Sequence, residues 1–162
     1  MATTDNIAYA TSNAITITLN SLASSSTAGR GGAAVDNTSN KYDDALVYVQ
    51  FKVGTGVAND RAIYVYVYGS EDGTNYDGSS AENVGTDAAV TLDTVTNLRG
   101  PVPVSVSTNS ITVKKVFSVA SFFGGVMPRK WGVVVQNFCG SALTGTPSDH
   151  AVTYTGITYT NA

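Results

Sequence analysis

Apolar and polar residues alternate along much of the chain. In residues 47–53 every second residue is valine or phenylalanine, whereas tyrosine, glutamine and lysine occupy the positions between them. Residues 15–19 alternate isoleucine or leucine with threonine, and residues 63–68 alternate isoleucine or valine with tyrosine. Because successive side chains of a strand point to opposite faces of its sheet, this period of two predicts half-buried β-strands. Weaker patterns of the same kind occur in residues 88–92, 102–107, 111–119, 131–138 and 151–159.

These segments predict about eight strands and almost no helix. Residues 118–131 hold at most a short helical turn, because Gly124, Gly125 and Pro128 interrupt them. A chain of 162 residues is expected to form one domain. The sequence therefore predicts an all-β fold, a single antiparallel β-sandwich that is most simply a jelly roll. We expect this domain to span residues 14–162 and to follow a polar N-terminal arm at residues 1–13.

Local features refine this pattern. Lys115 falls on the apolar face of its strand and Gly156 interrupts the alternation of the last strand, so a β-bulge is predicted at each position. The segment "KVGTGVANDR", residues 52–61, joins two strong strands and predicts a hairpin loop. Pro101 and Pro103 cannot donate to a strand ladder, which predicts an edge strand or a strand entry.

The longest interruption of the strand pattern is "ASSSTAGRGGAAVDNTSNK", residues 23–41. It contains one large aliphatic residue, Val35, and a single arginine, Arg30. Long loops without secondary structure are uncommon in compact domains and are usually functional or disordered. We expect this loop to be ordered, to lie across its own sandwich or a neighbour's, and to contribute to assembly contacts. A flexible linker rich in serine and glycine is the alternative.

Four residues of loop 23–41 are assigned to this predicted interface. Gly31 and Gly32 allow two backbones to approach closely and can adopt φ > 0 where other residues do not. The guanidinium group of Arg30 presents a fixed fork of donors, which suits a carboxylate or carbonyl groups on a partner. Asp36 and its neighbour Asn37 are expected to close a local turn by accepting hydrogen bonds from backbone N–H groups two residues further on.

Tyr64, Tyr66 and Tyr68 form a stripe on the face of their strand that points away from the predicted core. Such a stripe has three interpretations. The rings can lie under a loop such as residues 23–41, they can form a subunit interface, or they can stack on a ligand such as a sugar ring. We assign all three tyrosines to the candidate interface.

Charge is sparse in this chain. Only 13% of the residues are charged and the net charge is −3, where about 25% charged residues is typical. A neutral surface suits burial against protein partners or life outside the cell, whereas scattered lysines and arginines do not suit nucleic acid. No membrane span or signal peptide is expected, so synthesis in a cytosol is predicted. Cys139 is the single cysteine, which excludes an intrachain disulfide and is expected to be a small apolar residue at a strand end.

No group of residues predicts catalysis, a cofactor or a metal. His150, the only histidine, is expected at a loop or strand entry, and its neighbour Asp149 is expected to point away from it. One histidine and one cysteine do not make a zinc site. The acidic segment 71–77 contains Asp-Gly dipeptides that predict turns, and a calcium site is the weaker interpretation. Asp43 and Asp44 are adjacent and would point to opposite faces of a strand, so the sequence does not support a pair of carboxylates for glycoside cleavage.

Four segments carry a resemblance to a known class of proteins. They are "SLASSSTAGRGGAAVDNTSNKYDDALVYVQFKVGTG", "YVYVYGSEDGTNY", "FGGVMPRKWGVVVQNFCGSAL" and "SDHAVTYTGI", and together they extend from Ser21 to Ile157. In these segments, strands are separated by loops of small residues, and in this the chain resembles small structural proteins of tailed bacteriophage virions. The class that the chain resembles most is the capsid decoration, or cement, protein.

This resemblance implies a non-enzymatic protein without cofactors that binds the major capsid protein on the outer shell and reinforces the lattice. It further implies a homo-oligomer, most simply a trimer, that assembles in the host cytoplasm into the virion and contacts neither nucleic acid nor membrane. The arm at residues 1–13 would then order on a neighbouring subunit. Two alternatives are a tail or adsorption module, which binds host-surface carbohydrate through the tyrosine face, and a lyase or hydrolase on a β scaffold.

Overall fold

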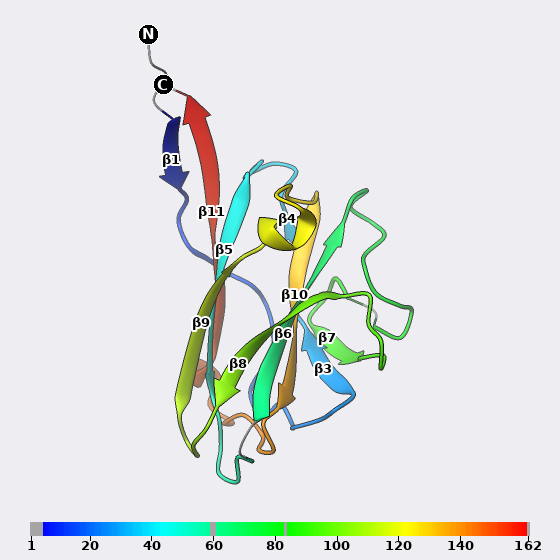
Figure 1. Cartoon of the computed structure of the whole chain (residues 1–162), viewed down its shortest axis with the longest axis vertical. Coiled ribbons are helices and arrows are strands. Elements are labelled where there is room, and N and C mark those ends of the chain that lie inside the picture. The colour runs from blue at the N-terminus through cyan, green and yellow to red at the C-terminus, as the bar shows by residue number, and fades with distance from the viewer. Residues whose placement is uncertain (1–4, 59–60, 83, 162) are drawn as a thin grey trace.

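The computed structural model describes residues 5–58, 61–82 and 84–161, and it shows an all-β protein (Figure 1). Two antiparallel sheets pack face to face, which confirms the predicted β-sandwich. Sheet A contains β1 (Asp5–Tyr9), β2 (Asn13–Ala14), β5 (Asp44–Lys52), β9 (Thr112–Ser118) and β11 (Ala151–Asn161). Sheet B contains β3 (Ala28–Gly31), β4 (Val35–Asp36), β6 (Arg61–Ser70), β7 (Ala88–Thr91), β8 (Arg99–Val106) and β10 (Lys130–Phe138).

The strand order is that of a jelly roll. Sheet A runs β1-β11-β5-β9, with β2 also pairing with β11, and sheet B runs β7-β3-β10-β6-β8, with β4 also pairing with β10. The chain changes sheet between β5 and β6, and again at each step from β8 to β11, whereas β6 and β8 are neighbours in sheet B. With β1 and β2 counted as one interrupted strand, and β3 and β4 as another, eight strands form the double Greek key and β7 is added at one edge.

The core lies between the two sheets. Val47 and Phe51 of β5 and Val65 of β6 are fully buried there, on the faces that the alternation predicts. The ring of Trp131 on β10 meets the ring of Tyr154 on β11 edge to face, with 5.3 Å between centroids. A fully buried valine or phenylalanine side chain stabilises the fold by roughly 1.5–3 kcal/mol relative to an exposed one.

Helix is confined, within the described residues, to two single turns. They are the 3-10 helices η1 (Ala120–Phe123) and η2 (Pro147–Asp149). The first is the short turn expected in residues 118–131, and it ends at Gly124, which adopts φ 68°. No helix in the part of the chain that the structure describes is long and apolar enough to span a bilayer.

The prediction of a structureless loop over residues 23–41 is wrong, because the segment contributes β3 and β4 to sheet B. Both strands pair with β10, with Gly31 opposite Val134 and Val35 opposite Trp131. Close packing explains the small residues: a Cβ on Gly29 would lie 2.9 Å from the carbonyl oxygen of Val135. A strand built from such residues lacks the apolar alternation by which strands are predicted.

The segment between β6 and β8 folds over the outer face of sheet B. There, Tyr68 packs with Val90, Leu92, Leu98 and Val134 in a second hydrophobic cluster. The corresponding face of sheet A carries half-buried and exposed side chains on β5 and β9. The two outer faces of the sandwich therefore differ, because the chain itself covers part of only one of them.

The hairpin predicted at residues 52–61 is wrong, since β5 lies in sheet A and β6 in sheet B. Residues 59 and 60 of this segment lie outside the described residues. The connection is one of the sheet-to-sheet crossings of the jelly roll. Two successive strands form a hairpin only when both belong to one sheet. The alternation of apolar and polar residues does not show which sheet a strand joins.

The two predicted bulges are also wrong. The pairing of β5 with β9 continues without a break past Lys115, whose amine reaches across to the carbonyl oxygen of Pro103 in sheet B, 3.0 Å away. The pairing of β5 with β11 continues past Gly156. The ring of Tyr42 occupies the space that a Cβ on Gly156 would need. Among the described pairs, a register shift lies instead between β6 and β8 at Val65.

Two smaller predictions are confirmed. Pro101 and Pro103 lie in β8, which is the edge strand of sheet B. Cys139 directly follows β10 and is buried, with its Sγ atom 3.2 Å from the carbonyl oxygen of Ser141. Both positions follow from side-chain chemistry alone, because proline has no N–H to donate and a thiol is a small apolar group.

Residues 5–9 of the predicted arm form β1, which pairs with residues 157–161 of β11 in the same chain. Figure 1 shows these two strands projecting beyond the rest of the sandwich. We call β1 and residues 157–161 the ribbon. Residues 1–4 of the predicted arm lie outside the described residues, and a contact of the arm with a neighbouring subunit stays a prediction.

Candidate functional site

The three tyrosines of the predicted stripe have different environments. Tyr68 is fully buried, and its hydroxyl donates a hydrogen bond to the carbonyl oxygen of Gly32 at 2.6 Å. The ring of Tyr76 covers it edge to face, with 5.5 Å between centroids. Burial raises the pKa of the Tyr68 phenol well above its usual value. Tyr68 therefore fits the interpretation of structural cover, partly by the segment 23–41, and not that of an exposed interface.

Tyr64 and Tyr66 remain half-buried and line a hollow of about 400 Å³ on the outer face of sheet B. We call this hollow the tyrosine groove. Gln136 and Phe138 of β10 line it beside the two tyrosines. The rings of Tyr64 and Phe138 are stacked at 30°, with 6.4 Å between centroids. The rest of the lining comes from five residues of two other segments, namely Ser26, Thr27, Leu92, Asp93 and Thr94.

A hydrogen-bonded glutamine fixes the shape of the tyrosine groove. The hydroxyl of Tyr66 donates to Oε1 of Gln136 at 3.2 Å, and Nε2 of Gln136 donates to the carbonyl oxygens of Ser25 and Ser26 at 3.3 and 2.9 Å. Burial, followed by the nearby Tyr64 and Glu82, raises the pKa of the Tyr66 phenol. The phenol is thus neutral near pH 7 and keeps the proton that it donates to Gln136.

Arg30 has its carboxylate partner within the chain. Its Nε donates to Oδ1 of Asp87 at 2.5 Å, and its terminal nitrogen donates to the Asp87 carbonyl oxygen at 3.0 Å. Asp87 also accepts hydrogen bonds from the backbone and the hydroxyl of Thr18, at 2.9 and 2.6 Å. The hydrogen bond from Arg30 comes first among the causes that lower the pKa of Asp87 to about 2. The sequence contains no signal that pairs positions 30 and 87.

The other interface residues assigned from segment 23–41 lie in two settings. Gly31 and Gly32 are buried in sheet B, below the surface where a partner would contact them. Asp36 is exposed and accepts a hydrogen bond from the backbone N–H of Thr38 at 2.8 Å, which confirms the predicted local turn. The hydrogen bonds from Thr38 lower the pKa of Asp36. Asn37 does not form such a turn, because its side chain bridges the backbone of Tyr42.

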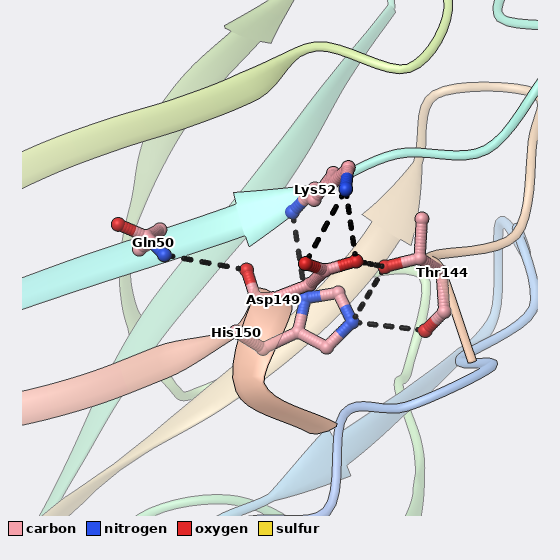
Figure 2. A network of polar contacts seen from close by, with 5 residues as sticks. All are labelled: Gln50, Lys52, Thr144, Asp149 and His150. Atoms are coloured by element: carbon pink, nitrogen blue, oxygen red, sulfur yellow. Dashed lines mark hydrogen bonds and ion pairs between the residues drawn. The ribbon is translucent and has the colours of Figure 1, made fainter. Parts of the chain in front are cut away.

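His150 belongs to a polar network at the end of β5, and it directly precedes β11 as predicted. Figure 2 shows Lys52, Asp149 and Thr144 gathered around its ring. Its Nε2 lies 2.9 Å from the carbonyl oxygen of Thr144 and its Nδ1 lies 3.4 Å from the backbone nitrogen of Lys52. A carbonyl oxygen only accepts and an N–H only donates, so these partners assign the proton to Nε2.

The same network uses Asp149, which was expected to point away from His150. Its carboxylate accepts a hydrogen bond from Oγ1 of Thr144 at 2.8 Å and pairs with the amine of Lys52 at 3.2 Å. The hydrogen bond from Thr144 comes first among the causes that lower the pKa of Asp149. Figure 2 shows that these contacts join η2 to the end of β5. The network braces a corner of the sandwich, and the hydroxyl of Thr144 also lies 3.4 Å from Nε2 of His150.

Several acidic residues considered in the sequence analysis, for a metal site or for a carboxylate pair, accept hydrogen bonds from donors of the chain. Asp72 accepts hydrogen bonds from the backbone N–H groups of Asn75 and Thr74, both at 2.7 Å, and these lower its pKa. Asp77 pairs with Arg99 at 3.0 Å. Asp44 accepts hydrogen bonds from the backbone of β5 and from η1. No group of three or more potential metal ligands occurs among the residues that the structure describes.

A further candidate surface, which the sequence analysis missed, lies on the outer face of sheet A. Ile7 pairs with Tyr159, and Tyr9 follows Ile7 on the same face of the ribbon. Strand pairing through Tyr48 of β5 places Val116 of β9 on that face as well. All four of Ile7, Tyr9, Val116 and Tyr159 are more than half exposed, at 55%, 64%, 55% and 57%. We call this surface, marked by those four residues, the docking face.

The docking face is apolar at the ribbon and polar at the other end of the sheet. Lys52 and Lys114, which share this face of sheet A, lie at the end of the strands away from the ribbon. The other face of the ribbon carries only small or polar side chains at the paired positions Ala8 and Thr158. The alternation of apolar and polar residues in β1 is typical of a half-buried strand. The sequence analysis did not predict this strand, because residues 1–13 are mostly polar.

No protein-family model matches this chain, and no curated protein matches it. The observations therefore establish the fold class alone, which is an all-β sandwich with jelly-roll strand order.

Proposed function

We propose that the chain is a non-enzymatic structural protein of a tailed bacteriophage virion, which binds the outer capsid shell as a decoration protein and reinforces the lattice. One observation carries this proposal, namely the docking face with its four exposed apolar side chains. Large apolar residues that lie together on a sheet face, as Ile7, Tyr9 and Tyr159 do on the ribbon, are typical of surfaces that contact another protein. The resemblance of the sequence to phage structural proteins supplies the identity of the assembly.

The ribbon favours a second copy of this chain as the first occupant of the docking face. A two-stranded ribbon is marginally stable in water, and it needs a third strand or a packing partner on its apolar face. The ribbon extends beyond the sandwich (Figure 1), so it can reach a neighbouring subunit. A hollow of about 620 Å³ beside Tyr159, lined in part by Tyr42 and Val126, offers a socket for a side chain of that neighbour.

A closed ring of three subunits is the simplest assembly consistent with this geometry and with the three-fold positions of a capsid lattice. In such a ring the ribbon of one copy contacts the socket of the next, and the combined surface contacts the major capsid protein. The low content of charged residues, 13%, is consistent with extensive burial against other subunits. Assembly of this kind takes place in the host cytoplasm and requires no cofactor.

The location of the protein in purified virions tests the proposal. Virions of the phage that carries the gene would be purified, and the position of the protein would be determined by cryo-electron microscopy with antibody labelling. We expect density on the outer shell at the three-fold positions. A location on the tail, or the absence of the protein from purified virions, would contradict the proposal.

A matched pair of variants connects the result to the docking face. Tyr9→Lys with Tyr159→Lys is expected to abolish binding to capsids that lack the protein, because two charges would be buried in an apolar contact. Val95 provides the control, since it is 86% exposed but lies outside the docking face. Val95→Lys should bind as the unaltered chain does.

A further inference from the structure

The tyrosine groove lies on sheet B, and its chemistry differs from that of the docking face. The half-buried ring of Tyr64, which is stacked at 30° with the ring of Phe138, lines the groove, and we call it the aromatic platform. Beside the platform are hydroxyl groups of Ser26, Thr27 and Thr94 and the carboxylate of Asp93. We propose that the tyrosine groove is a saccharide-binding site, in which a neutral pyranose ring stacks on Tyr64 and its hydroxyl groups bond to the polar rim.

The lining combines the two chemical surfaces that a pyranose presents. The C–H groups on a face of the sugar ring are apolar and pack on the face of an aromatic ring, whereas the hydroxyl groups around the ring edge need hydrogen-bond partners. The platform supplies the first kind of contact and the rim supplies the second. The volume of about 400 Å³ lies within the usual range for small-ligand sites.

The groove is held in shape by the chain itself. Gln136 is buried, and it connects the hydroxyl of Tyr66 to the backbone of the segment that carries Ser26. Next to this segment, the backbone N–H of Leu92 donates to the carbonyl oxygen of Thr27 at 2.8 Å, and the backbone N–H of Asp93 donates to Oε1 of the fully buried Glu82, with 3.4 Å between nitrogen and oxygen. A site whose walls are already ordered loses less conformational entropy when a ligand binds, which favours the weak contacts that sugars make.

The charge of the rim selects among saccharides. Asp93 is exposed, and none of the described side chains that line the groove belongs to a lysine or arginine. A carboxylate accepts hydrogen bonds from sugar hydroxyl groups but repels the carboxylate of a uronic or sialic acid. The groove therefore favours neutral or N-acetylated sugars over acidic ones.

A proline-rich peptide is the other class of ligand that aromatic grooves bind. Its backbone offers mainly carbonyl acceptors, because proline has no N–H. The carboxylate of Asp93 is an acceptor as well, so a proline-rich peptide would leave it without a donor. A sugar hydroxyl donates and accepts, and this chemistry favours the saccharide.

This inference goes beyond the proposed capsid function and does not depend on it. The tyrosine groove and the docking face lie on the two opposite outer faces of the sandwich. A subunit whose docking face is covered by further copies of the chain would therefore keep the tyrosine groove open to the medium. Surface polysaccharide of the host is then the saccharide that the groove would meet.

A glycan array that also carries proline-rich peptides tests the proposal. The labelled full chain is expected to retain at least one neutral or N-acetylated glycan and to discriminate against acidic glycans. Titration calorimetry with the retained glycan should show that Tyr64→Ala weakens binding by about tenfold or more, through loss of the stacking platform. Asp93→Asn should also change the affinity, and it alters an exposed side chain without disturbing packing.

Tyr48→Ala is the matched control, because Tyr48 is a half-buried tyrosine on sheet A and outside the groove. Its glycan affinity should equal that of the unaltered chain. Three results would overturn the proposal. They are failure to retain any glycan, retention that neither Tyr64→Ala nor Asp93→Asn changes, and retention of proline-rich peptides alone.

Discussion

Replacement of Arg30 by alanine tests whether this residue braces the fold. Arg30 binds Asp87 through two hydrogen bonds, and Asp87 in turn holds the backbone of Thr18. The contact joins β3 to the segment that follows β2 and to the strand entry of β7. We expect Arg30→Ala to leave the chain folded but less stable.

The pKa of Asp87 sets the magnitude. It falls from the ordinary value of 3.8 to about 2, and the hydrogen bond from Arg30 is the first cause. A shift of one unit corresponds to about 1.4 kcal/mol, so the favourable surroundings of the carboxylate contribute up to about 2.5 kcal/mol. About a fifth of the Asp87 side chain is exposed and Thr18 supplies part of the effect, so we expect Arg30→Ala to cost about 1–2 kcal/mol.

The sign of the pH dependence follows from the lowered pKa. A carboxyl group whose pKa is lower in the folded state stabilises the fold above its unfolded pKa, and this contribution disappears as the pH falls through the folded pKa. For Asp87 the stabilisation is therefore complete above pH 4 and decreases towards pH 2. The difference between the unaltered chain and Arg30→Ala should shrink over the same interval.

Urea unfolding at pH 7 and at pH 2.5, followed by circular dichroism, measures these differences. Lys130→Ala is the control, because Lys130 forms a longer contact of 4.0 Å with the exposed Asp36. Its urea midpoint should not change measurably. The reasoning is refuted if Arg30→Ala matches the unaltered chain at pH 7, or if its deficit is the same at both pH values.

Three further predictions concern the packing. Tyr68→Phe removes the 2.6 Å hydrogen bond to the buried Gly32 carbonyl and should cost about 1–3 kcal/mol in urea unfolding; an unchanged midpoint would show that the carbonyl has another donor. Gly132→Ala places a methyl group against the Tyr68 ring and should destabilise the chain by about 1–3 kcal/mol or more, and normal thermal stability would contradict this. Cys139 is buried, so it should react with a thiol reagent only after unfolding, and rapid reaction of the native chain would contradict its position.

The strands of the jelly roll were predictable where large apolar residues alternate with polar ones. Residues 47–53 and 63–68 show this, because every second side chain fills the same core. The alternation failed at β3, where close approach of β10 leaves no room for large side chains. It also failed at Lys115 on the edge strand β9, whose long side chain extends to sheet B and donates a hydrogen bond to the carbonyl oxygen of Pro103. In these cases the tertiary neighbours, and not the local pattern, decide the structure.

The candidate sites were predictable in part. The tyrosine stripe was visible from its period, but the burial of Tyr68 depends on the fold of the segment between β6 and β8. The carboxylate partner expected for Arg30 exists, yet it is Asp87 of the same chain and not a residue of another subunit. Partners that lie 57 residues apart in the sequence come together only through the sheet order. The docking face depends equally on strand pairing, since its four residues come from three strands.

The mass of the chain in solution tests the central claim most directly, namely that the docking face is covered by further copies of the chain. Light scattering coupled to size exclusion, at micromolar concentration, should give three times the monomer mass of 16.7 kDa, which is about 50 kDa. The variant with Tyr9→Lys and Tyr159→Lys should give 16.7 kDa, and Val95→Lys should remain a trimer. A mass of 16.7 kDa for the unaltered chain, or a trimer that persists in the double variant, would contradict the claim.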